Sequence, residues 1–260
     1  MSDNKQNWSE LLNEAVTIPG RLSECYSAFW SYSLGNQAAA ASQLSARGLP
    51  ISPIASFKAW KEKGRSVKKG EKAIALCMPL TGKKENKETG ETETFAFFAW
   101  KNNWFSLNQT EGEDYAAEVK TPTWDKSLAL EALKITEGTF DHVDGNCQGY
   151  ASGRSIAVNP LAVLPHKTRF HELAHVVMGH CAETTLSDSE KTPKDIKEAE
   201  AEGTAYILCS LLGLPGLEES RGYIQSWLSG APIPEKSAQR IFSAADKILK
   251  AGNIQTTKGE

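Results

Sequence analysis

The chain lacks long apolar runs and has few cysteines. No apolar stretch approaches the roughly 20 residues that a membrane-spanning helix needs, so we expect no membrane partner. The first ten residues, MSDNKQNWSE, have neither the basic start nor the apolar core of a signal peptide. The cysteines are scattered without C-x-x-C spacing, at Cys25, Cys77, Cys147, Cys181 and Cys209. The simplest interpretation of this pattern is a protein of a reducing compartment. We therefore expect a cytoplasmic protein.

Charge is divided unevenly along the chain. Its 260 residues suffice for two domains of about 120–140 residues each, and a hydrophobic content of 40% is usual for a globular protein. The formal net charge is −3. Residues 1–120 carry 15 Lys and Arg against 14 Asp and Glu, whereas residues 121–260 carry 14 against 18. The basic excess therefore lies in the N-terminal half.

Residues 56–72, SFKAWKEKGRSVKKGEK, hold seven basic, two acidic and two aromatic residues. Phosphates bind cations and unstacked bases stack on rings, so this composition favours single-stranded DNA. A solvated helix and turn is the alternative. For each of the two tryptophans that we propose to stack on bases, a place in the core is an equal alternative. The predicted DNA-binding residues are Lys58, Trp60, Lys61, Lys63, Arg65, Lys68, Lys69, Lys72 and Trp104.

Periodicity and turn residues predict an α+β chain. We expect N-terminal helices at 5–16, 22–46 and 55–63. The stretches 73–80 and 95–100 predict a hairpin with a long polar tip at 81–94, and residues 103–109 extend its sheet. Downstream we expect a helix at 126–136, strands within 139–158, a helix around residues 167–181, an acidic loop at 183–195, a helix from 198, and helices at 217–229 and 235–251.

The segment 110–124 is rich in acidic and small residues and contains Pro122, which is typical of a linker. We therefore predict two domains joined by residues 116–125. The first, at 1–115, is an α+β domain, and the second, at 126–260, is mainly helical with a small sheet.

The sequence HELAH at 171–175 has the spacing of a metal site. Four residues make about one helical turn, so the imidazoles of His171 and His175 leave one face and can hold one Zn²⁺, with Glu172 beside them. Two surface histidines and an acid on an amphipathic helix are the alternative. A zinc ion held by two histidines needs another protein ligand.

The acidic stretch at 197–209, KEAEAEGTAYILC, is the best source of that ligand. On a helix, Glu198 and Glu202 share a face with small alanines, whereas Glu200 points elsewhere. We predict Glu198 as the ligand and Glu202 as the acid that orients a ligating histidine. The reverse assignment stays open, because spacing cannot order two residues on one face. A solvated acidic face is the remaining alternative.

The other histidines are weaker candidates. On a continuous helix His180 would point away from the metal, and its more ordinary place is near free carbonyls at a helix C-terminus.

Three protein ligands leave a fourth position for water, from which Glu172 would take a proton. Residues 149–158 predict a turn and a short strand, whose edge could pair with an extended peptide, although a plain structural hairpin is equally consistent.

These segments together resemble the ArdC-type antirestriction family of plasmids and phages. The resemblance rests on Tyr32-Ser33 with Asn36, Gln37 and Gln43, on SFKAWKEKGRSVKKGEKA at 56–73, on WFSLNQTEG at 104–112, and on HELAH with EAEAEGTAYILC at 198–209. The last two motifs are also similar to the ImmA and IrrE type of regulatory zinc peptidase. The resemblance implies a single-stranded-DNA-binding domain and a zincin-like domain, with His171, His175 and Glu198 as metal ligands and Glu172 as the catalytic acid.

We therefore expect a protein that binds single-stranded DNA, carries a zinc metallopeptidase site for an unknown protein substrate, and protects incoming DNA from restriction. Two alternatives are a DNA-binding protein with a silent zincin domain and a regulatory peptidase that cleaves a repressor. The segment before the motif helix, GNCQGYASGRSIAVNPLA, is closer to the regulatory peptidases than to the ArdC pattern.

Overall fold

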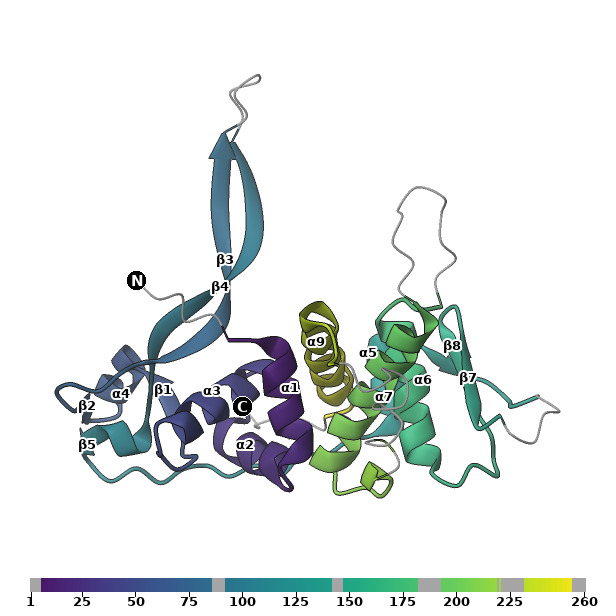
Figure 1. Ribbon diagram of the computed structural model, residues 1–260, viewed down its shortest axis with the longest axis horizontal. Coiled ribbons are helices and arrows are strands. Elements are labelled where there is room, and N and C mark those ends of the chain that lie inside the picture. Colours follow the sequence, from purple (N-terminus) through teal and green to yellow (C-terminus); the bar gives the residue numbers. More distant parts are fainter. Residues whose placement is uncertain are drawn as a thin grey trace, which may run out of the picture.

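A computed structural model describes residues 6–85, 92–141, 147–181, 193–218, 220 and 232–253. It confirms the α+β class (Figure 1). A hairpin of β3 (Ile74–Glu85) and β4 (Thr92–Ser106) projects from the N-terminal helices, and β7 (Gly149–Ser152) and β8 (Ser155–Val158) lie at the other end of the molecule. The predicted loop at 183–195 and helix at 217–229 fall mostly outside the described residues.

Three helices begin the chain: α1 (Trp8–Thr17), α2 (Arg21–Phe29) and α3 (Leu34–Ala46). The prediction of one helix over 22–46 was wrong. Ser33 has an extended backbone, and the amide of Leu34 donates to Asp246 Oδ1 of α9 (Glu235–Gly252) at 3.1 Å. A free amide at a helix start needs an acceptor, so a tertiary contact fixes where α3 begins.

The helix α3 covers the free edge of β3 with two amide side chains. Gln43 accepts from the amide of Ala75 at 2.9 Å and donates to its carbonyl at 2.8 Å. Asn36 accepts from the amide of Cys77 at 2.8 Å and donates to its carbonyl at 3.0 Å. Each side chain thus makes the pair of bonds that a neighbouring strand would make, and the first part of the β3 edge is covered.

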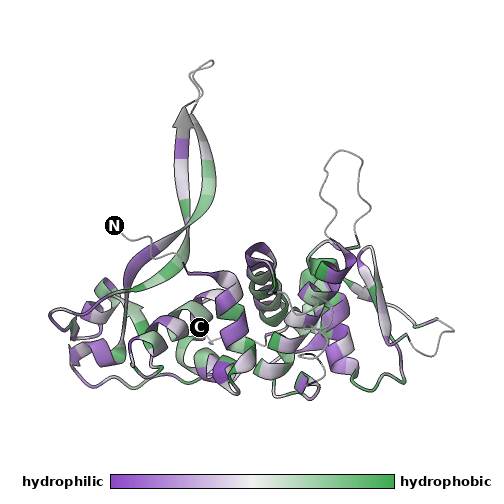
Figure 2. Cartoon of the chain, in the orientation of Figure 1, coloured by the Kyte–Doolittle hydropathy of each residue, from purple (hydrophilic) through white to green (hydrophobic). Residues whose placement is uncertain are grey.

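The strands β3 and β4 form a longer hairpin than the sequence predicts. They pair antiparallel as far as Glu85 and Thr92, inside the segment that we expected as a polar tip. The ring of Phe95 covers Gly82, where an added Cβ would lie 2.6 Å from the ring, and this packing supports pairing through a residue that disfavours strands. Figure 2 shows hydrophobic positions along the projecting hairpin, where Phe95, Phe97 and Phe98 are exposed.

The expected strand at 103–109 is the end of β4, which pairs with β1 (Ile54–Ser56) before the short helix η1 (Leu107–Gln109). Beside this sheet, α4 (Phe57–Glu62) leads into β2 (Arg65–Val67), which pairs antiparallel with β5 (Thr110–Gly112). The basic segment therefore forms a helix, a strand and the turn that follows them.

The C-terminal half carries a second small sheet beneath a helix. After α5 (Lys126–Leu133), the sheet runs in the order β6 (Thr136–Glu137), β8, β7, with β7 at an edge. The helix α6 (Pro165–Val177) packs on β7 and β8 and against α7 (Lys194–Leu211). Arg169 of α6 binds both carboxylate oxygens of Glu137 at 2.8 and 2.9 Å, which fixes the helix against the sheet.

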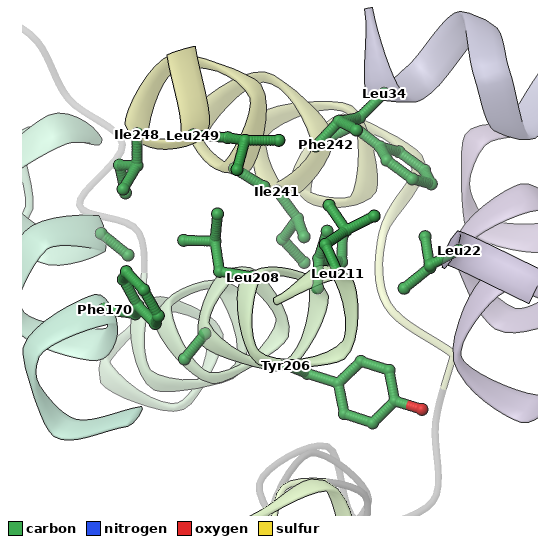
Figure 3. Close-up of a cluster of buried hydrophobic side chains, with 14 of the residues drawn as sticks. Leu22, Leu34, Phe170, Tyr206, Leu208, Leu211, Ile241, Phe242, Ile248 and Leu249 are labelled. Atoms are coloured by element: carbon green, nitrogen blue, oxygen red, sulfur yellow. The ribbon is translucent and has the colours of Figure 1, made fainter. Parts of the chain in front are cut away.

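One cluster of buried side chains joins the two halves (Figure 3). Leu22 and Leu34 come from the N-terminal helices, and they meet Leu211 and Phe242 of α7 and α9 in the same cluster as Phe170 of α6. The N-terminal helices thus pack on the C-terminal half, and the division into domains near residue 115 stays a prediction.

Among the helices of the described residues, none combines the length and the apolar character that crossing a bilayer requires.

The Arg169–Glu137 pair gives a pH-dependent test of this packing. Hydrogen bonds from Arg169 hold the pKa of Glu137 below its ordinary value of 4.5, so the pair stabilises the fold above pH 4.5 and its contribution is lost as the pH falls through the lowered pKa. We expect Glu137→Gln to cost about 1–2 kcal/mol of unfolding free energy at pH 7 and progressively less as the pH falls below 4.5, measured by urea unfolding.

Glu131→Gln, at an exposed position of α5, is the matched control and should be neutral at every pH of this series. A loss for Glu137→Gln that stays constant as the pH falls through the range below 4.5 would contradict the assignment.

Candidate metal centre

The two histidines of the HELAH motif lie on one face of α6. This helix begins with Pro165, whose fixed φ suits a first helical turn, and continues through the motif without a break. The Nε2 atoms of His171 and His175 are 3.1 Å apart, and both side chains are largely buried. Both ring nitrogens therefore point at one common position.

The helix α7 supplies two carboxylates to the same place. Glu198 Oε2 lies 3.3 Å from His171 Nε2 and 3.6 Å from His175 Nε2. Glu202 Oε2 lies 3.1 Å from the other nitrogen of His171, Nδ1. Ala201 and Ala205, fully buried on this side of α7, let the two helices approach closely. Glu198 alone of the two acids is placed beside both Nε2 atoms.

The spacing of these three donor atoms fits a small divalent cation. At the usual bond length for zinc and tetrahedral angles, donor atoms lie roughly 3.3–3.4 Å apart. The triangle formed by the two Nε2 atoms and Glu198 Oε2 has sides of 3.1, 3.3 and 3.6 Å. These three residues also form the group of potential metal ligands found among the described residues. Two imidazoles and a carboxylate are an ordinary zinc donor set.

Electrostatics favour positive charge at this position. Burial alone would lower the pKa of His171, but its hydrogen bonds to Glu198 and Glu202 outweigh burial and raise the pKa to about 9. The neighbouring imidazoles of His171 and His175 hold the pKa of Glu198 far below its ordinary range. The two carboxylates thus stabilise a cation between the helices.

Glu202 is held from both sides. Its Oε1 lies 2.7 Å from Lys167 Nζ, and its Oε2 contacts His171 Nδ1. Burial raises the pKa of Glu202, but the hydrogen bonds from His171 and Lys167 bring it down to about 2. An ionised acid on Nδ1 requires a proton there and leaves Nε2 free to bind a cation.

Glu172 follows the first histidine and is buried, which raises the pKa of its carboxyl group. Its side chain lies against Gly149 at the start of β7, where an added Cβ would be 3.3 Å from Glu172 Cγ and 2.9 Å from the carbonyl oxygen of Ala157. Glycine is needed there because the edge strand and the motif helix touch.

Two residues of this region were missed from the sequence. His180 lies just past the C-terminus of α6, as expected, but its ring contacts side chains instead of free carbonyls: its Nδ1 is 2.9 Å from His175 Nδ1, and its Nε2 is 2.8 Å from Glu200 Oε2. Glu200, which does point away from Glu198, binds Arg240 of α9. The signal that could have found them is Gly179, a residue that commonly reverses the chain after a helix.

The predicted DNA-binding lysines are exposed on α4 and after β2: Lys58, Lys61, Lys63, Lys68, Lys69 and Lys72. Arg65 is partly buried and binds Thr110 and the carbonyl oxygen of Glu113. Trp60 and Trp104 are only 1% and 9% exposed, so their predicted stacking role is not supported. Trp60 donates to the carbonyl oxygen of Phe105 at 2.8 Å, which places it in the core.

Comparisons with known proteins agree with this architecture. Residues 4–120 match the family model for the N-terminal domain of anti-restriction factor ArdC. The metal-free crystal structure of antirestriction protein ArdC from plasmid R388 aligns with 95% of this chain and 95% of that chain, at 19% identity and a TM-score of 0.54. The Mn(II)-bound structure aligns with 95% of this chain and 96% of that chain, at 19% identity and a TM-score of 0.50. Curated protein sequences give no match.

The fold is thus α+β, as predicted, and it is shared with ArdC of plasmid R388. Residues 4–120 thus resemble the N-terminal domain of anti-restriction factor ArdC in sequence, and the rest of the chain resembles ArdC of plasmid R388 in fold.

Proposed function

We propose that this chain is a metallopeptidase of the ArdC type that binds Zn²⁺ through His171, His175 and Glu198. The observation that carries the proposal is the triangle of donor atoms between α6 and α7, whose sides match those around a tetrahedral ion. The Mn(II)-bound form of the R388 protein supports a divalent cation in this fold.

Each residue of the site has a distinct task in this proposal. When bound, the cation supplies a Lewis acid that activates water and polarises a peptide carbonyl. Glu172 accepts a proton from water, and its raised pKa suits it to pass that proton on near neutral pH. Glu202 and Lys167 hold the imidazole of His171 in the tautomer that leaves Nε2 free.

The edge strand β7 is where we place the substrate. Within the described residues β7 pairs only with β8, and α6 packs directly on it. An extended peptide that adds to this edge would run along the face of the motif helix. The substrate we propose is therefore an unfolded or extended segment of a protein.

For the N-terminal half we propose single-stranded DNA as the partner. Six lysines of the basic segment are exposed, and Phe57, 54% exposed at the start of α4, presents a ring among them. Cations beside an exposed ring suit phosphates and unstacked bases. Together with the match of residues 4–120 to the N-terminal domain of anti-restriction factor ArdC, this supports protection of incoming DNA from restriction as the biological role.

Metal content tests the cation site. We expect about one zinc per purified wild-type chain and none in His171→Ala, measured by inductively coupled plasma mass spectrometry after dialysis. His166→Ala is the matched control, because His166 is exposed one and a half turns earlier on the same helix and should leave zinc unchanged. Equal zinc in all three proteins, or none in wild type, would rule the site out.

Salt dependence tests the DNA surface. Each phosphate neutralised on a single strand contributes about −0.7 to the slope of log affinity against log salt. Changing Lys61, Lys68 and Lys69 together to Ala should weaken binding of a labelled oligonucleotide and make the slope shallower by about 2. A control with three exposed lysines elsewhere changed to Ala, Lys194, Lys236 and Lys247, should keep the slope. If both triple variants behave alike, the basic segment is not the DNA surface.

A further inference from the structure

The chain reverses directly after α6 and returns a third histidine to the site. Gly179 has a left-handed backbone with φ of 74°. Its amide donates to the carbonyl oxygen of Val176, and the amide of His180 donates to that of His175. These two bonds are the Schellman arrangement for a helix C-terminus. The reversal is why His180 faces His175, although on a continuous helix it would point away.

Buried polar groups hold His180 there. Its side chain is only 3% exposed and that of Glu200 only 1%. Arg240 Nη1 lies 3.0 Å from Glu200 Oε2, and its Nη2 donates to the carbonyl oxygen of Met178 at 3.0 Å. Lys197 Nζ donates to the carbonyl oxygen of His180 at 3.2 Å. Arg240 of α9 and Lys197 of α7 thus satisfy the carbonyl oxygens of Met178 and His180, where the chain reverses after α6.

With His180 neutral, the polar contacts of this network have one consistent direction. A carboxylate beside a guanidinium accepts hydrogen bonds, so His180 carries its proton on Nε2 and donates it to Glu200. Nδ1 of a neutral His180 is then an acceptor, which requires the proton of His175 on Nδ1. Nε2 of His175 is left with a free lone pair that faces His171 and Glu198.

We propose that His180 is a positioning residue for the metal centre, which sets the tautomer and the ring orientation of His175 through Glu200 and Arg240. The proposal rests on the proposed metal site. Both ligating histidines are then oriented by a carboxylate that is paired with a cation. For His171 the carboxylate is Glu202, which Lys167 neutralises. For His175 it is Glu200, which Arg240 neutralises and which acts through the imidazole of His180.

Two substitutions at the same position separate this role from a packing role. In His180→Asn the amide oxygen can still accept from His175 Nδ1, whereas His180→Leu has no acceptor, and both lose the bond to Glu200. We expect the Zn²⁺ affinity, measured by competition with a chromophoric chelator, to fall about 10–100-fold in His180→Leu and less than about 3-fold in His180→Asn. The visible spectrum of the Co²⁺-loaded protein should change only in His180→Leu.

Glu200→Gln provides a second variant should His180→Leu fail to fold in circular dichroism. Arg240 can only donate, so it holds the amide oxygen and turns the amide NH₂ towards His180. The proton of neutral His180 then moves from Nε2 to Nδ1, which leaves His175 Nδ1 as the acceptor and puts the proton of His175 on Nε2. The Zn²⁺ affinity should again fall about 10-fold or more.

Equal affinities in wild type and every folded variant would overturn the inference and leave the metal site intact. An equal loss in His180→Asn and His180→Leu would also overturn it, since the acceptor for His175 Nδ1 would then make no difference. If wild type binds no Zn²⁺, both this inference and the proposed function fail.

Discussion

The contact between the imidazoles of α6 and the carboxylates of α7 is the interaction on which the rest of the site depends. Buried carboxylates are costly unless they are paired, and here each has a cationic or proton-donating neighbour. Glu198 and Glu202 share His171, and Lys167 completes the pairing of Glu202. The charge balance is what raises the pKa of His171 to about 9, against the effect of burial.

Close helix packing makes this contact geometrically possible. The alanines that face α6 leave no bulky side chain between the helices, and on the opposite side Gly203 of α7 lies against Ile241, where an added Cβ would be 2.9 Å from the isoleucine. The helix α9 contacts both halves of the chain. Its Arg240 binds Glu200 beside the site, and its Asp246 accepts a hydrogen bond from the first amide of α3. The helix that supports the candidate metal centre therefore also positions the N-terminal helices.

Sequence periodicity was sufficient for the features that depend on one helix at a time. The four-residue spacing of His171 and His175, and the shared face of Glu198 and Glu202, follow from helical geometry alone. Contacts that depend on tertiary structure could not be predicted in that way. His180 returns to the site only because Gly179 reverses the chain, and the break before α3 depends on a carboxylate 212 positions away.

The same limit explains the tryptophans. Trp60 lies in a basic segment whose composition suits DNA, but the fold turns its ring inward and uses its indole NH to bind β4. The composition of a segment does not show which side of a short helix faces the core when lysines and aromatic residues alternate in its sequence. Phe57, at the first position of α4 and 54% exposed, is the ring that the fold leaves in solvent.

The central claim is that the metal centre cuts protein. Mass spectrometry of new protein N-termini in cells that express wild type or Glu172→Gln tests it most directly, since the substitution removes the proton acceptor and leaves every proposed ligand in place. The account predicts fragments of at least one cellular protein in wild type that are absent with Glu172→Gln, while both proteins retain zinc. Identical fragments in both, or none in either, would contradict it and favour a DNA-binding protein with a silent zincin domain.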